Sequence, residues 1–596
     1  MATSKRLKGF LGLNTRDHPA SWPWWTKAQN VMAASGYPDA QAILRPGTSR
    51  LFSTPLTDPE CHGLFSWISE ADGLLKLMFM GEEDIFWSGD WTAALTVDNC
   101  GAADWTWAAT DLFNAIATQA MVYLVNGSIA GYGTNWRFDG TNIHPMGLKA
   151  PTVAPGLAVG AGGALTGTYA YVYTYYDPTL ERESDPSPAA SIDLTADVCN
   201  ITTTATTDAS ATKVRLYRTV ANGSKYFFVK QYDPTDTTDE LADNLLGYEV
   251  GDAGTNKDTI GFVAKCIALM SDGRVVIAND VTNARPRRLA ASYDNSHPES
   301  FPLSSYLNAG EENGYEIVAL VPLGDELCVI CEESLWMLNT TCTSCTRRVP
   351  DVGGVGPWCG CSSPWGVFFI SHDGVYLFDG ATTRRVSDVI RDTWDSVVKW
   401  ALHGASIVYD GETDHVLVSV MRDAKLTEND TILALDCKTI LWPDCRWSIW
   451  TVAADKLESV KAYDGVAKYV VFSHNGTGIL RTFSREVYAD QGVAIPVLMQ
   501  SGPEELDQPT LKKLYRRAHV EIQPVAGGTL TVGLATDAGA VDDVTVACSM
   551  TKANHRVSFG VRGRAGQLSL AADMLGYKFR FIEAVLEGDV LERRAD

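Results

Sequence analysis

Six cysteines lie close together in the chain with a spacing that resembles that of metal ligands: Cys328, Cys331, Cys342, Cys345, Cys359 and Cys361. Four thiolates from two tight turns can close a tetrahedron around Zn²⁺. The first two lie inside an apolar, strand-like run, where positions three apart point to opposite faces and cannot bind one metal. The remaining four, Cys342, Cys345, Cys359 and Cys361, fit a zinc site or an extracellular disulfide. Free thiols are the usual state in a protein made in a cytoplasm.

Patterns that would support catalysis are sparse. The turns His372-Asp373-Gly374 and Ser271-Asp272-Gly273 partly resemble the Asp-box turn of sialidases but lack its following Thr and Trp. Glycosidases need two carboxylates about 5 to 9 Å apart, and a sequence alone does not show such a pair. The chain contains no phosphate loop, no nucleophile elbow and no His-Glu-x-x-His string. We therefore expect a protein that is not an enzyme and that has no cofactor, and we interpret both Asp-Gly pairs as hairpin turns.

The chain is acidic, with 49 Lys and Arg against 72 Asp and Glu and a formal net charge of −23. A protein that grips DNA is expected to be basic, because phosphate neutralisation supplies most of the non-specific affinity. The composition therefore argues against a conventional nucleic-acid-binding role. One basic cluster stands out near the C-terminus, formed by Lys512, Lys513, Arg516 and Arg517. A solvated face or a subunit contact is favoured over nucleic-acid binding for it.

Short β-strands with polar turns between them recur along most of the chain. In Val367–Ile370 and Val375–Phe378, β-branched and aromatic residues flank the dipeptide Asp373-Gly374, which is typical of a hairpin. Looser copies of this pattern form units of roughly 40 to 50 residues, each with three or four strands, as in β-propeller blades. We predict an all-β protein with a propeller of about six or seven blades. A set of β-sandwiches is the alternative.

A region of different character interrupts the repeats. Residues 151–163 have the Pro, Gly and Ala composition of a linker. The run Thr168–Tyr175 then alternates strictly, so its tyrosines share one face, and we expect that face to be core. Strand signals end near Tyr248, which predicts an inserted fibronectin-like β-sandwich. Longer strand signals after Met499 predict a second, C-terminal β-sandwich.

The predicted organisation has five regions: an N-terminal segment (1–60), a first propeller segment (61–150), the inserted β-sandwich (151–255), a second propeller segment (256–499) and the C-terminal β-sandwich (500–596). No apolar run reaches the roughly 18 residues of a membrane span, and the N-terminus lacks the apolar stretch of a signal peptide. We expect a soluble protein without membrane insertion.

Several short motifs resemble those of one family, the tail nozzle or packaged-DNA-stabilisation proteins of short-tailed bacteriophages, which include the podovirus tail tubular protein B. The motifs are Gly12-Leu13-Asn14, Ala28-Gln29-Asn30, Leu44-Arg45-Pro46-Gly47, Leu165–Tyr171, Glu183–Ser187, Arg215–Thr219, Ser371–Asp388 and Arg562-Gly563-Arg564. The resemblance extends over most of the chain, but its motifs are structural. It therefore supports a prediction of architecture and role, but it assigns no function to any single residue.

The resemblance implies a structural virion protein that forms a homohexameric ring at the tail tip. Such a nozzle retains the packaged genome and conducts it during DNA ejection, and a negative wall would keep the passing duplex from sticking. The implied partners are other copies of the chain, a tail adaptor or portal-proximal protein, tail fibres or spikes, and phage DNA in passage. The implied location is the virion, after assembly in the host cytoplasm. The alternatives are a glycan-binding or glycan-cleaving propeller at the host surface and a tail component of a longer-tailed phage.

Overall fold

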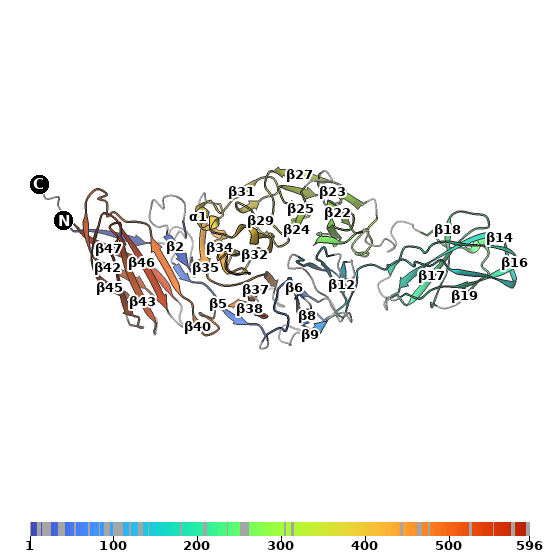
Figure 1. Ribbon diagram of the computed structural model, residues 1–596, viewed down its shortest axis with the longest axis horizontal. Coiled ribbons are helices and arrows are strands. Elements are labelled where there is room, and N and C mark those ends of the chain that lie inside the picture. The colour runs from blue at the N-terminus through green and yellow to red at the C-terminus, as the bar shows by residue number, and fades with distance from the viewer. Residues whose placement is uncertain are drawn as a thin grey trace. The chain divides into compact units, whose positions relative to one another are not determined.

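A computed structural model shows an all-β protein (Figure 1). It describes residues 2–8, 13–14, 25–33, 42–52, 55–69, 72–82, 84–88, 96–98, 111–118, 121–128, 135–140, 142–178, 182–206, 211–234, 237–250, 262–302, 305–310, 315–441, 445–461, 468–474, 477–484, 486–523, 527–551, 553–573 and 579–591. The chain divides into two compact units. The first consists of residues 1–113, 332–335 and 348–596, and the second of residues 114–331 and 336–347.

The first unit contains four groups of four antiparallel strands. They are β6 (Gly63–Ile68), β7 (Leu75–Met80), β8 (Ile85–Ser88) and β9 (Thr96–Asp98); β28 (Gly360–Ser363), β29 (Gly366–Ser371), β30 (Gly374–Phe378) and β31 (Thr383–Arg385); β32 (Ser406–Asp410), β33 (His415–Val420), β34 (Thr431–Asp436) and β35 (Arg446–Trp450); and β36 (Leu457–Lys461), β37 (Lys468–His474), β38 (Ile479–Ser484) and β5 (Gly47–Arg50). The first strands β28, β32, β36 and β6 lie side by side in that order. Neighbouring groups bury their apolar faces against each other, as in the cluster of Leu417, Trp450 and Phe472.

The hairpin expected around Asp373-Gly374 is present, but its turn lies one residue earlier than predicted. Ser371 pairs with Gly374, so His372 and Asp373 form the turn and Gly374 opens β30. A Cβ atom at Gly374 would lie 2.5 Å from Ser387 Oγ. Glycine is therefore needed at this position for close packing rather than for the reversal of the chain.

The second unit contains three further groups of four antiparallel strands, the last of which extends past its boundary. They are β10 (Asn114–Thr118), β11 (Met121–Val125), β12 (Trp136–Phe138) and β13 (Ile143–Pro145); β20 (Ala264–Leu269), β21 (Val275–Asp280), β22 (Arg285–Ala291) and β23 (Tyr306–Asn308); and β24 (Ile317–Leu323), β25 (Glu326–Cys331), β26 (Ser334–Leu338) and β27 (Cys345–Pro350). Here too the first strands β10, β20 and β24 are neighbours. Among the described residues the chain thus has seven groups of four strands, an arrangement consistent with propeller blades.

A six-stranded sheet lies between β13 and β20 in the sequence. Its strands are β14 (Gly156–Asp177), β15 (Arg182–Glu183), β16 (Ala190–Thr202), β17 (Lys213–Thr219), β18 (Tyr226–Tyr232) and β19 (Thr237–Asp239), and the short 3-10 helix η1 (Asp243–Leu245) follows. Tyr169, Tyr171, Tyr173 and Tyr175 are at most 7% exposed and share one apolar cluster. The expectation that the tyrosine face is core is confirmed. The fibronectin-like sandwich stays a prediction.

A buried charged network joins this sheet to other segments of the second unit. Arg182 donates to Asp177 and to Glu299, each at 2.7 Å, and all three side chains are at most 3% exposed. Glu299 also accepts from the backbone N–H of Gly147 at 2.6 Å and from the hydroxyl of Tyr123 at 3.2 Å. Burial alone would lower the pKa of Arg182, but the two carboxylates raise it above its ordinary value. The guanidinium is therefore a permanently charged centre of this network.

Segments from the N-terminal and C-terminal parts of the chain form strands of the same sheets. β1 (Ala2–Lys8), β3 (Val31–Ala33) and β4 (Ala42–Leu44) join β47 (Arg580–Val590), β42 (Lys513–Ile522) and β45 (Asn554–Gly563). β2 (Trp25–Gln29) connects β35 to β41 (Val497–Ser501), β46 (Gly566–Asp573), β43 (Thr529–Thr536) and β44 (Val541–Ala547). β5 pairs with β38 and with β39 (Ala489–Asp490), which pairs with β40 (Val493–Ala494). The segment 1–60 thus supplies strands to sheets formed mainly by later residues.

Helical structure in the described residues is limited to short segments. Besides η1, these are η3 (Asp388–Ile390), α1 (Arg391–Asp395), η4 (Lys399–Gly404) and η5 (Cys437–Thr439). None of the described helices has the length and apolar character needed to cross a membrane.

Candidate functional site

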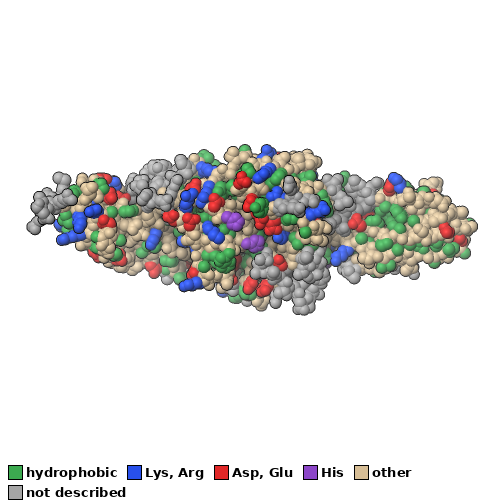
Figure 2. Space-filling model, turned by 45° about the horizontal axis from the view of Figure 1, so that its top comes forward, with side chains coloured by type: hydrophobic (Ala, Val, Ile, Leu, Met, Phe, Trp, Pro, Cys, Tyr) green, Lys and Arg blue, Asp and Glu red, His purple; other side chains and the backbone are tan. Residues whose placement is uncertain are grey.

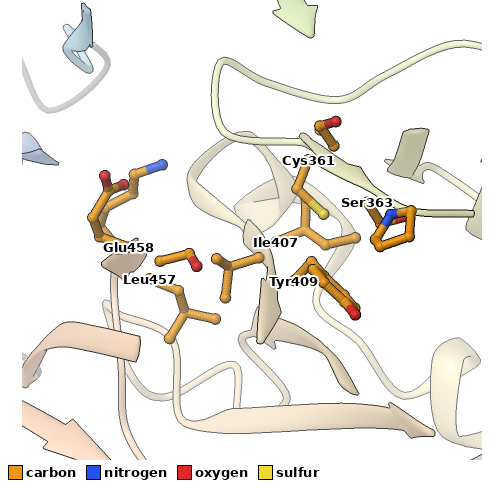
Figure 3. A pocket seen from close by; sticks show the side chains of 12 residues that line it. Cys361, Ser363, Ile407, Tyr409, Leu457 and Glu458 are labelled. Carbon is orange, nitrogen blue, oxygen red and sulfur yellow. The ribbon is translucent and has the colours of Figure 1, made fainter. Parts of the chain in front are cut away.

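A cavity of about 500 Å³ opens between the first strands of three neighbouring groups in the first unit (Figure 3). Its walls come from β28 and the turn after it, from Ile407, Val408 and Tyr409 on β32, and from residues 456–459 at the start of β36. Figure 3 shows Glu458 on one side of the cavity and Cys361 with Tyr409 on the other. Side chains alternate along a strand, so residues 456 and 458 extend to the same side of β36.

Glu458 and Lys456 carry the charge of this cavity. The Glu458 carboxylate accepts from Ser66 on β6, from the backbone N–H at 3.3 Å and from the hydroxyl at 3.2 Å. Burial raises the pKa of Glu458 to about 7, against the lowering effects of Lys456 and Ser66. Burial lowers the pKa of Lys456, whose Nζ lies 5.0 Å from the centre of the Trp358 ring. Glu458 can therefore exchange a proton near neutral pH while it ties β6 to β36.

The thiols around this cavity have pKa values raised by burial. Burial raises the pKa of Cys361 to about 12 and that of Cys359 to about 11, although Lys456 lowers both. A thiol with such a pKa is a poor nucleophile and a poor metal ligand at neutral pH, because both roles need the thiolate. Among the described residues that line the cavity, Glu458 is the only carboxylate. The lining therefore does not supply the carboxylate pair that glycoside hydrolysis requires.

A second cavity, of about 430 Å³, lies at the N-terminal ends of the first strands in the same unit. It is lined by Trp400 on η4, which is 70% exposed, and by Glu60 and Glu428. Burial and the nearby charge of Glu60 raise the pKa of Glu428. His62 and His403 also line this cavity. Asp455 lines it as well, so an exposed indole beside three carboxylates gives the cavity a stacking surface and several hydrogen-bond acceptors.

The structure does not bring the four predicted cysteine ligands together as one site. Cys342 and Cys345 pack in an apolar cluster of the second unit, whereas Cys359 and Cys361 belong to the first unit. All four are free thiols, and the described residues contain no group of three or more His, Cys, Asp or Glu side chains placed to hold a metal ion. Burial raises the pKa of Cys345 to about 12, which is the behaviour of a core thiol.

The predicted basic cluster divides into one buried and three exposed side chains. Lys513 is fully buried, and its ammonium group donates to the backbone carbonyls of Gln508, Leu511 and Arg564. Lys512, Arg516 and Arg517 are exposed. Lys513 therefore belongs to the fold, because its three donors satisfy carbonyls at the end of β42. The subunit contact predicted for the cluster remains a prediction for the other three.

Two of the N-terminal motifs meet in the structure. Arg45 is fully buried and donates to Asn30 Oδ1 at 2.9 Å and to both carboxylate oxygens of Asp490. Asn30 in turn donates to Thr451 Oγ1 and to the carbonyl of Pro496, each at 2.7 Å. These contacts fix the N-terminal segment to the ends of β35 and β39. The sequence singled out Asn30 and Arg45 through the resemblance, but no motif pointed to Asp490.

Comparisons with known proteins give no family and only distant structural matches for this chain. No protein-family model and no curated protein matches the chain. Among solved structures, the N-terminal part of BBS1 in complex with ARL6 matches with a TM-score of 0.26 and 9% identity over 74% of this chain and 98% of that chain. An exo-β-1,3-galactanase from Phanerochaete chrysosporium matches with a TM-score of 0.16 and 7% identity over 80% of this chain and 95% of that chain. TmCBM61 in complex with β-1,4-galactotriose matches with a TM-score of 0.13 and 11% identity over 22% of this chain and 80% of that chain.

At such TM-scores the solved structures carry no argument about the activity or ligands of this chain. The class of protein follows from its own strands: it is an all-β, propeller-like protein with many small four-stranded antiparallel sheets. No family is established for it.

Proposed function

We propose that this protein is a structural component of a phage virion and that six copies form the ring-shaped nozzle of the tail. In this proposal the seven groups of four strands are the blades of one propeller, closed by the pairing of β5 with β38. The six-stranded sheet is an inserted β-sandwich. The strands from residues 500–596, in sheets that also contain N-terminal strands, form the C-terminal sandwich. The family resemblance of the sequence motifs, together with this architecture, supports the assignment.

The observation that carries the proposal is the charge of the inserted region. Residues 151–255 contain 14 acidic and 6 basic residues. All six basic side chains are engaged: five form ion pairs with carboxylates, and Lys230 donates to the carbonyl of Thr238. Carboxylates such as Asp193 and Glu240 are exposed. A region with excess negative charge and no unengaged cation repels phosphate, as the wall of a DNA conduit must.

In this proposal the conduit lies between copies of the chain rather than through one propeller. In the first unit, β28, β32, β36 and β6 carry few charged residues: Asp410, Glu458 and Lys461. Asp410 is buried, and Glu458 is bound to Ser66. The acidic lining predicted for the passage is therefore better supplied by the inserted region.

Purified particles offer a direct test of this proposal. We expect mass spectrometry to find the chain in the virion and immunogold labelling to place it at the distal end of the tail. Absence of the chain from the particle, or label confined to the capsid or to fibre tips, would contradict the nozzle assignment. Label along a long tail tube would favour the alternative of a longer-tailed phage.

The second cavity favours one other function, the binding of host-surface glycans. The exposed face of Trp400 can stack on a sugar ring, while Glu60 and Glu428 can accept hydrogen bonds from its hydroxyls. Maltotriose and cellotriose are suitable probes, with titration followed by tryptophan fluorescence and calorimetry. We expect Trp400→Ala to abolish binding and Trp365→Ala, which removes another partly exposed indole, to preserve it. Lack of binding by the native chain, or equal binding by both variants, would exclude this function.

A further inference from the structure

One face of the terminal sheet carries three exposed arginines, Arg517 on β42 and Arg556 and Arg562 on β45, which we name the arginine face. Along β45 buried and exposed residues alternate without interruption, so Arg556 and Arg562 point to the same side. In the pairing of β42 with β45, Arg517 lies opposite Ser558, two residues from Arg556. Arg517 and Arg556 are therefore neighbours, and Arg562 lies on the same side of the sheet, six residues from Arg556 along β45. Figure 2 shows basic side chains gathered over the end of the molecule that holds these strands.

A β-bulge shapes this face. The register of β42 shifts between Tyr515 and Arg517 against both of its neighbours. Arg516 is the extra residue in the pairing with β47, whereas β45 has the extra residue in its pairing with β42. Arg516 and Arg517 are consecutive, yet both are exposed, which regular alternation would forbid. The bulge lets Arg516 reach Asp589 on β47 and leaves Arg517 directed toward β45.

Three acidic residues of β47, the strand on the other side of β42, have partners within the chain, and Glu521 of β42 lies on the same side as Arg517. Glu583 binds Arg6 at 2.6 Å, Asp589 binds Arg516, and Glu587 lies 3.6 Å from His519. By contrast, none of the described residues forms an ion pair or a side-chain hydrogen bond with the guanidinium groups of Arg517, Arg556 or Arg562. The arginine face therefore presents three positive charges that the rest of the described chain does not neutralise.

These cations lie in a region of the chain whose basic and acidic residues nearly balance. Residues 500–596 hold 12 basic and 13 acidic residues, whereas the first 499 residues hold 37 and 59. A second copy of the chain therefore offers a strongly anionic surface to the arginine face of the first. Charge complementarity of this kind guides association and fixes register.

We propose that the arginine face binds carboxylates on the anionic region of a neighbouring copy. Where that neighbour belongs to the proposed ring, the contact is head to tail, because different surfaces of the two copies meet. Guanidinium groups can bind carboxylates through two parallel hydrogen bonds, which gives such a contact directional specificity.

The test is the self-association of the full chain, measured by sedimentation velocity at 50 and 500 mM NaCl. We expect association at low salt that weakens at high salt, because exposed ion pairs are screened. The triple variant Arg517→Glu, Arg556→Glu, Arg562→Glu should weaken association at least about tenfold, since it replaces attraction by repulsion at three positions. A matched control, Arg347→Glu, Arg348→Glu, Lys425→Glu, makes the same charge change at three other exposed cations and should associate at least as tightly as the native chain.

Each result decides the proposal. Equal association of the native chain and the triple variant, or no association of the native chain, overturns it. Binding of a 30-base-pair duplex that the triple variant loses and the control keeps would assign the face to DNA instead. A second triple variant with Gln at the same positions, monitored by circular dichroism, separates loss of charge from loss of folding. The nozzle function is tested separately by the location of the chain in the particle, so failure of this contact leaves that test intact.

Discussion

Replacing Glu299 by Gln removes the carboxylate on which the buried network of the second unit converges. Gln has nearly the same shape, so the change deletes charge rather than volume. Its amide oxygen can still accept from the N–H of Gly147, but it no longer neutralises Arg182, which is 3% exposed. Arg182 keeps its contact with Asp177 at 2.7 Å. Arg137, whose Nε lies 3.8 Å from Glu299, loses the nearby negative charge as well.

The structure gives this change a large expected cost. Breaking a buried ion pair by removing one partner costs about 3 to 5 kcal/mol, because the other charge stays buried without compensation. We expect the lower value, about 3 kcal/mol, since Asp177 remains. A unit of this size loses about 2 to 4 °C of melting temperature per kcal/mol, which gives a decrease of about 6 to 12 °C. If opening is local, amide exchange in β14 and β15 should accelerate about 100-fold.

Hydrogen-exchange mass spectrometry and calorimetry measure both quantities on the intact chain. Peptides from β42 and β45 in the first unit are an internal control and should keep their exchange rates. Asp233→Asn is the matched surface change, because Lys213 and Asp233 pair at 2.6 Å with exposures of 34% and 71%. Exposed pairs of this kind contribute about 0 to 1 kcal/mol. If Glu299→Gln perturbs the protein no more than Asp233→Asn does, the network does not anchor the inserted region.

Three further changes test other regions of the structure. The pKa of Glu458 is raised from 4.5 to about 7, so the folded state binds this proton more tightly than the unfolded state does. The group therefore costs stability as pH rises from about 4.5 to 7. Urea titrations should show a smaller loss of stability with rising pH in Glu458→Gln than in the native chain. Gly366 has φ of +129°, and a Cβ atom there would lie 2.3 Å from the carbonyl oxygen of Phe378. Gly366→Ala should therefore lower the free energy of unfolding by about 1 to 3 kcal/mol. The control Gly404→Ala should be nearly neutral, because the space around Gly404 is open. Arg45→Met leaves a carboxylate on β39 without its buried partner and should expose the N-terminal segment to limited proteolysis.

The central strands of each group could be predicted from the sequence, because they are buried on both faces and form continuous apolar runs. Leu75–Met80, Val416–Val420 and Ser334–Leu338 match β7, β33 and β26. Some strands gave no clear signal. The inner strand β22 begins with Arg-Pro-Arg-Arg and the first strand β28 reads Gly-Cys-Ser-Ser, since partly exposed strands tolerate polar residues and proline. The predicted strand at Ile129–Tyr132 and the turn at Asp464-Gly465 lie outside the described residues.

The candidate sites were harder to predict, because distant segments form them. Arg182 and Glu299 are 117 residues apart, and Trp400 shares its cavity with Glu60 across 340 positions of the sequence. The arginine face depends on a β-bulge at Arg516, and no local sequence motif predicts that bulge. The basic cluster was visible in the sequence, but the separation of buried Lys513 from its exposed neighbours required the register of β42.

The central claim is that copies of this chain form the wall of a tail nozzle. Electron cryo-microscopy of the particle that contains the chain tests it most directly. We predict six copies around the tail axis at its distal end, with the region 151–255 facing the DNA passage and the arginine face at the contact between copies. Density for the chain away from the tail axis, as a monomeric or fibre-borne domain, would contradict the claim.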